Sequence, residues 1–165
     1  MRRFLARTAL AAHTPGVVAL CVTLGAIPAF AQTTWPQAQR LVESTLAKHP
    51  EAAHIVLHVT PPGAPDTDNL VIASNIGRIG KKADEDDLRI MHTGHVETVV
   101  AKSGDRFNVS LPLLDAPGRT IGVVAVGFPY KAGDDQAELS ANAERIRDEL
   151  RPQVADVKVL FRTTP

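Results

Sequence analysis

Four of the six histidines fall in two short stretches near the middle of the chain. His54 and His58 belong to an alternating segment that predicts a strand, so they would share one face but lie roughly 13 Å apart at about 3.3 Å per residue. That separation is too large for one metal ion. His92 and His95 flank Thr-Gly and could converge, but no carboxylate or thiol has the spacing to join them. We expect surface or hydrogen-bonded histidines, and metal or haem binding stays open as the alternative.

Basic and amide side chains near predicted turns are better candidates for binding a small molecule. Arginine and lysine beside glycine turns can hold a carboxylate or phosphate through charge-assisted hydrogen bonds. Arg106 and Asn108 share the polar side of a predicted strand, opposite Phe107 and Val109, as a ligand site under a covering loop requires. The predicted ligand site comprises Arg78, Lys81, Arg89, His92, His95, Arg106 and Asn108.

The chain carries none of the familiar catalytic motifs. There is no GxSxG, no HExxH and no phosphate-binding P-loop. The acidic run at residues 84–87 lacks the alternating spacing of a calcium loop, and acids crowded before a helix suit its positive end. We expect a protein that is not an enzyme, with no catalytic residues, no metal site and no cofactor.

The first 31 residues have the pattern of a secretory signal peptide. Three arginines stand among the first seven residues, residues 17–29 are apolar, and an A-x-A sequence ends at Ala31. An uncleaved membrane anchor is the alternative, but the apolar run is short for a span and Pro15-Gly16 would break a long helix. We expect cleavage after Ala31, which removes the only cysteine, Cys21. The mature chain, residues 32–165, is then a single periplasmic domain without thiol chemistry.

The clearest structural signal is a hairpin over residues 106–128. Residues 106–113 alternate between apolar and polar, which predicts a strand with one face in the core. Asp115 to Gly118 supply the turn. Residues 120–128 are apolar on both faces, which places this strand in the middle of a sheet. Gly122 and Gly127 indicate positions where another group packs close to the backbone, or a bulge.

Other segments complete a mixed fold. Apolar stripes and caps predict helices over residues 34–48 and 134–151, and a short helix over residues 83–92. Alternation predicts strands over residues 53–60, 70–74 and 95–101. A short edge strand is expected over residues 155–161. Five strands in hairpin order with helices at both ends indicate an α+β fold.

The hairpin sequence LPLLDAPGRTIGVVAVGF resembles the closing hairpin of Cache domains, the extracytoplasmic PAS-like sensor modules. Upstream, LVIASN at residues 70–75 and IGK at residues 79–81 are similar to another stretch of that family. The resemblance covers residues 54–130. It implies a PAS/Cache-like fold, with a central five-stranded antiparallel sheet, flanking N- and C-terminal helices and a short helical insertion. It also implies a ligand pocket between the sheet and the segment that joins the second and third strands.

We therefore expect an exported, sensor-like domain that binds a small molecule. If it signals, it would present its ligand state to a separate membrane signalling or transport partner. The formal net charge of zero gives no reason to expect nucleic acid, and no stable membrane span is expected after processing. Two alternatives stay open: a periplasmic metal- or haem-binding protein on the same fold, and a structural or interaction protein without a ligand pocket.

Overall fold

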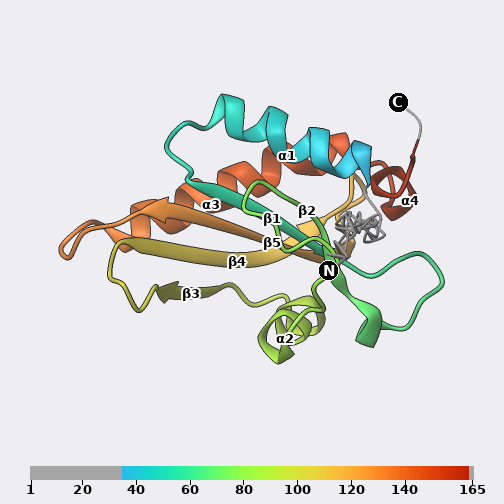
Figure 1. Ribbon diagram of the computed structural model, residues 1–165, viewed down its shortest axis with the longest axis horizontal. Coiled ribbons are helices and arrows are strands. Elements are labelled where there is room, and N and C mark those ends of the chain that lie inside the picture. The colour runs from blue at the N-terminus through green and yellow to red at the C-terminus, as the bar shows by residue number, and fades with distance from the viewer. Residues whose placement is uncertain (1–34, 164–165) are drawn as a thin grey trace, which may run out of the picture. The chain divides into compact units, whose positions relative to one another are not determined.

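A computed structural model describes residues 35–163 of the chain; the expected signal peptide lies outside these residues. The described part contains a sheet, three longer helices and several short helical turns (Figure 1). In chain order the elements are α1 (Pro36–Lys48), β1 (His54–Val59), η1 (Asp66–Asp68), β2 (Leu70–Ser74), α2 (Glu85–Thr93), β3 (Glu97–Val100), β4 (Arg106–Leu114), β5 (Thr120–Pro129), α3 (Gln136–Leu150), η2 (Arg151–Gln153) and α4 (Val157–Leu160).

The five strands form one antiparallel sheet in the order β2-β1-β5-β4-β3. The predicted central position of the strand over residues 120–128 is confirmed, because β5 pairs with β1 on one side and β4 on the other. Val124, in the middle of β5, has no exposed surface. The expected α+β fold with a five-stranded antiparallel sheet is therefore correct.

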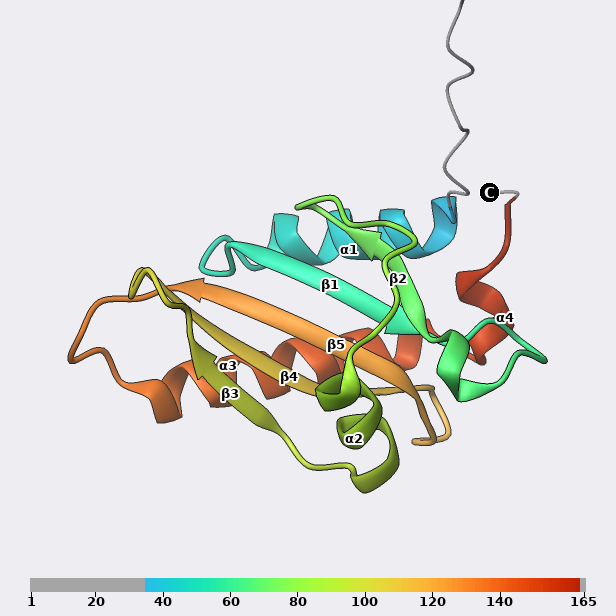
Figure 2. The ribbon, with the colours of Figure 1, turned by 60° about the horizontal axis from the view of Figure 1, so that its bottom comes forward.

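Helices α1 and α3 cover one face of the sheet, and the main hydrophobic core lies between them and the strands (Figure 2). Leu57 and Val59 of β1 and Ile146 and Leu150 of α3 are fully buried there. The other face is covered only in part, because α2 packs on β4 and β5 near one end. Among residues 35–163 no helix is long and apolar enough to cross a membrane.

The predicted turn between β4 and β5 is confirmed. Asp115 is fully buried, and its carboxylate accepts hydrogen bonds from the backbone N–H of Arg119 at 2.8 Å and from the Arg119 side chain at 2.7 Å. Burial alone would raise the pKa of Asp115, but these Arg119 contacts outweigh it and lower the pKa. Gly118 takes a positive φ of 92°, which glycine adopts without strain.

The expected edge strand over residues 155–161 is wrong. This segment contains α4, a single helical turn that begins after Asp156, whose side chain accepts a hydrogen bond from the Lys158 N–H at 2.7 Å. The turn packs against α1, and the ring of Phe161 meets Trp35 edge-on with centroids 5.6 Å apart. A run of apolar residues this short fits a helical turn as well as a strand. Here the segment packs against helix α1 and not against an edge strand of the sheet.

Candidate functional site

A cavity of about 390 Å³ lies on the sheet face opposite α1 and α3. Its floor is the sheet and its cover is the segment that leads from β2 to the start of α2, which is where the resemblance implied a pocket. We call residues 75–84 the covering segment. The residues that line the cavity are His54, Val56, His58, Val71, Ile76, Arg78, Lys81, Asp84, Asp87, Val99, Ala101, Arg106, Asn108, Ser110 and Ala125.

The strand register arranges the floor in rows that cross the sheet. In one row His54 of β1 stands beside Gly127 of β5, which pairs in turn with Asn108 of β4. In the next row Val56 pairs with Ala125, which pairs with Ser110. The middle strand therefore lines the cavity only with the small side chain of Ala125, while Gly127 lies under the ring of His54. Larger side chains of β1 and β4 stand on either side of this strand, so the floor of the cavity is lowest along β5.

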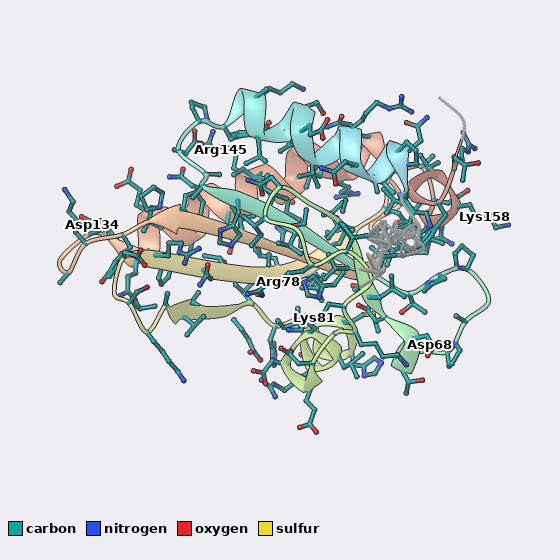
Figure 3. All side chains as sticks on the ribbon, viewed as in Figure 1. Asp68, Arg78, Lys81, Asp134, Arg145 and Lys158 are labelled. Atoms are coloured by element: carbon teal, nitrogen blue, oxygen red, sulfur yellow. The ribbon has the colours of Figure 1, made fainter. Side chains whose placement is uncertain are left out.

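Backbone hydrogen bonds hold the covering segment to the outer edge of β2. The N–H of Gly80 donates to the carbonyl of Val71 at 2.8 Å, and the N–H of Val71 donates to the carbonyl of Lys81 at 2.8 Å. A tight turn closes where the Lys81 N–H donates to the carbonyl of Arg78 at 2.9 Å. Figure 3 shows Arg78 and Lys81 on this segment as it passes in front of the sheet.

Arg78 has an unusual backbone conformation for its residue type. Its φ is +71°, and it is the only described residue other than glycine with a positive φ. For an L-residue with a side chain, this left-handed region costs roughly 1 kcal/mol. The turn therefore keeps an arginine at a position where glycine would be less strained.

The start of α2 is tied to β1 by an ion pair. Asp84 caps the helix by accepting a hydrogen bond from the Asp87 N–H at 3.1 Å, and the Asp87 carboxylate reaches back to the Asp84 N–H. The same carboxylate lies 2.8 Å from Nδ1 of His58, a contact with ion-pair distance but without hydrogen-bond geometry. Burial alone would raise the pKa of Asp87, but His58, the Asp84 N–H and the charge of Lys81 together lower it.

His54 lies at the other end of the same face. Its residue is only 7% exposed, and its ring occupies the space that a β-carbon on Gly127 would need. The prediction that a group packs close to Gly127 is confirmed, and that group is this imidazole. Burial lowers the pKa of His54, and the positive charges of Arg106 and Arg78 lower it further.

The cavity carries an excess of positive charge. Arg78 and Lys81 form no ion pair within residues 35–163, and the only carboxylate near Arg106 is Asp105, at 3.7 Å. The two acids in the cavity wall are already engaged, Asp84 in capping α2 and Asp87 with His58. An anion entering the cavity would meet Arg78 and Lys81, which are unpaired among residues 35–163, and Arg106, whose contact with Asp105 is long and exposed.

The structure brings together four of the seven predicted site residues and separates three. Arg78, Lys81, Arg106 and Asn108 line the cavity. Arg89 instead pairs with Asp86 at 2.7 Å and Glu97 at 2.6 Å on the outside of α2. His92 contacts Asp66 at 3.0 Å, and His95 is exposed after the end of α2. All three stand outside the cavity lining, and a ligand role for any of the seven stays a prediction.

Sequence reasoning missed the histidines of the floor. His54 and His58 both lie on one face of β1, as the alternation predicts, but that pattern alone favours surface or hydrogen-bonded histidines over site residues. The sequence shows the alternation of β1, but it does not show that β1 pairs with β5, and this pairing brings the histidines to the cavity. Within residues 35–163 no group of three or more histidine, cysteine or acidic side chains could hold a metal ion.

Comparison with known proteins places the fold but no family. No protein-family model matches the chain, and no curated protein matches it. The structure of the A. aeolicus nlh2 GAF domain in an inactive state is similar, with a TM-score of 0.51 and 9% identity over 78% of this chain and 85% of that one. The chain has a GAF/PAS-like fold.

A second solved structure gives the same result. The Agobacterium tumefaciens repressor BlcR is similar with a TM-score of 0.50 and 9% identity, over 72% of this chain and 67% of that one. At such low identity these likenesses show the fold alone.

Proposed function

We propose that residues 32–165 form an exported, Cache-like sensor domain that binds a small molecule carrying an anionic group, without transforming it chemically. The observation that carries this proposal is the charge of the cavity. Arg78, Lys81 and Arg106 converge on one space, and the acids in its wall are engaged elsewhere. A cavity of about 390 Å³ suits a small metabolite.

The remaining walls indicate the shape of the ligand. Val56, Val71 and Val99 give the cavity apolar surface, and Asn108 and Ser110 add hydrogen-bonding groups on β4. The mixture favours a compact organic anion, with an oxyanion head and an apolar body, over an inorganic ion. The fold likeness to a GAF domain and to a repressor supports the sensor part of the proposal. Any signal would pass to a separate membrane signalling or transport partner.

A thermal-shift screen tests this function. Organic acids should raise the melting temperature of the purified domain, whereas their neutral amides and matched amines should not. Arg106→Gln should weaken binding by about tenfold to a hundredfold, because a hydrogen bond to a charged group contributes about 1.5–3 kcal/mol. Arg40→Gln is the matched control, because Arg40 is an exposed arginine on α1, on the opposite face of the sheet.

The screen also discriminates the alternatives. A shift with neutral or cationic compounds alone would contradict the anionic ligand. No shift with any compound would favour an interaction protein without a ligand.

Export rests on the first 31 residues and has its own test. The arginines, the apolar run and the A-x-A sequence support cleavage after Ala31. N-terminal sequencing of the protein from a periplasmic extract should begin at Gln32. An intact Met1 on membrane-bound protein would contradict this.

A further inference from the structure

His54 is a buried polar side chain without a partner. The residue is 7% exposed and lines the cavity, and its ring forms no hydrogen bond or ion pair with any other described residue. Its ring nitrogens are not among the fully enclosed unpartnered atoms of the described residues, so they open onto the cavity, where they can accept or donate a hydrogen bond. A ligand in the cavity is the partner that the geometry provides.

The charged groups that face His54 are all positive. Arg106 approaches from β4 and Arg78 from the covering segment, and both charges act on the imidazole. On β5 the neighbour is Gly127, which has no side chain. The other titratable groups of the cavity belong to its far end, where Asp87 is held by His58, Asp84 caps α2, and Lys81 acts on Asp87. Asp105 lies beside Arg106, and its carboxylate is exposed.

We propose that the anion bound in this cavity contacts His54 and that its binding draws a proton onto that imidazole, so that the site binds anions more tightly as the pH falls. This inference rests on the proposed function, because it assumes an anionic ligand in the same cavity.

The coupling follows from the sign of the charges. In the free protein, burial and two guanidinium groups disfavour the imidazolium and lower the pKa of His54. A negative charge placed among these groups favours the imidazolium, which then donates a charge-assisted hydrogen bond to it. The pKa of His54 is therefore higher in the complex than in the free protein. By linkage, the added affinity is fully present below the lower of these two pKa values and is lost as the pH rises through the higher one.

Calorimetry with benzoate, an anion with an apolar ring that stays ionised near neutral pH, tests this inference. Titrations in two buffers with different ionisation enthalpies count the protons taken up. Wild-type protein should take up a fraction of a proton per benzoate near neutral pH. The affinity should rise steadily as the pH falls from about 8 toward about 5.5, by up to about tenfold for each unit by which binding raises the pKa of His54.

Two variants assign the proton. His54→Gln keeps a hydrogen-bonding group but cannot titrate, so its benzoate affinity should not change with pH and its proton uptake should vanish. His95→Gln makes the same substitution at an exposed histidine outside the cavity and should behave like wild type. Uptake that persists in His54→Gln would place the proton on another group and overturn the inference.

The possible failures are separable. Benzoate binding by wild type without proton uptake and without pH dependence would overturn the coupling while the proposed function stands. This result needs no variant, so it holds even where His54→Gln does not fold. Absence of benzoate binding at every pH would contradict the anion site and the coupling together.

Discussion

The imidazole of His54 rests against the backbone of Gly127, on the neighbouring strand, in the space that a β-carbon would fill. Gly127→Ala would therefore push the ring toward the cavity. We expect a loss of about 1–3 kcal/mol in the free energy of unfolding, as for other overpacked sites, and weaker benzoate binding. Urea unfolding and calorimetry measure the two effects.

Gly122→Ala provides the comparison. There the added carbon would meet the backbone carbonyl oxygen of His58, which has no rotamer to escape into. This variant should lose more stability than Gly127→Ala. Equal and small losses in both variants would mean that β1 and β5 are not packed as closely as described.

Arg78 keeps a strained backbone conformation that a glycine would relieve. Arg78→Gly should leave the stability unchanged or raise it by up to about 1 kcal/mol, because the relieved strain exceeds or matches the added freedom of the unfolded chain. The same variant should bind benzoate more weakly, since it lacks the guanidinium. Stability and binding would thus change in opposite directions, as expected where a residue is kept for its ligand.

Lys102→Gly is the control for this prediction, because Lys102 stands in an exposed turn without a positive φ. It should lose about 0.5–1 kcal/mol of stability. A comparable loss in Arg78→Gly would show that the Arg78 side chain stabilises the fold.

Asp87 ties the start of α2 to β1 through His58, and its carboxylate also accepts from the N–H of Asp84 at the end of the covering segment. Asp87→Asn removes the charge of that pair and weakens the cap of α2, so we expect a loss of about 1–2 kcal/mol. Amide hydrogen exchange should become faster across the covering segment and the first turn of α2. Asp86→Asn, at an exposed neighbour whose ion pair is with Arg89, should leave this exchange unchanged. Unchanged exchange in Asp87→Asn would mean that the ion pair does not hold the cover.

The stability of the ligand-free protein should depend on pH through His54 and Asp87. The pKa of His54 is lower in the folded protein than in the unfolded chain, so the unfolded state binds more protons below about pH 6.5. Thermal stability should therefore fall as the pH drops from about 7 toward 5, and His54→Gln should flatten this part of the curve. Asp87 has a lowered pKa, and its contribution should be lost only below about pH 4. A wild-type curve that stays flat between about pH 7 and about pH 5 would contradict the burial of His54.

The sequence was sufficient to predict the sheet and its central strand. Residues 120–128 are apolar on both faces, and only an interior strand accommodates that pattern. Asp115 and Gly118 marked the turn because their chemistry is local. The segment over residues 155–161 could not be assigned in this way, since its few apolar residues suit a strand edge or a helical turn equally well.

The candidate site was predictable only where its residues share a strand or a turn. Arg106 and Asn108 were found by alternation, and Arg78 and Lys81 by their neighbouring glycines. The position of His54 depends on the pairing of β1 with β5, which no local pattern specifies. Arg89 and His92 look equally suitable in the sequence, but α2 turns them outward, toward Glu97 and Asp66.

A small anion, on the proposed function, binds between the covering segment and the polar face of the sheet. Backbone amide chemical-shift mapping with benzoate would locate it. We expect the largest changes at residues 76–81, at residues 106–110 and along β1, and we expect a double variant, Arg78→Gln with Arg106→Gln, to abolish them. Changes that gather instead on the α1 and α3 side of the sheet, or that persist in the double variant, would contradict this expectation.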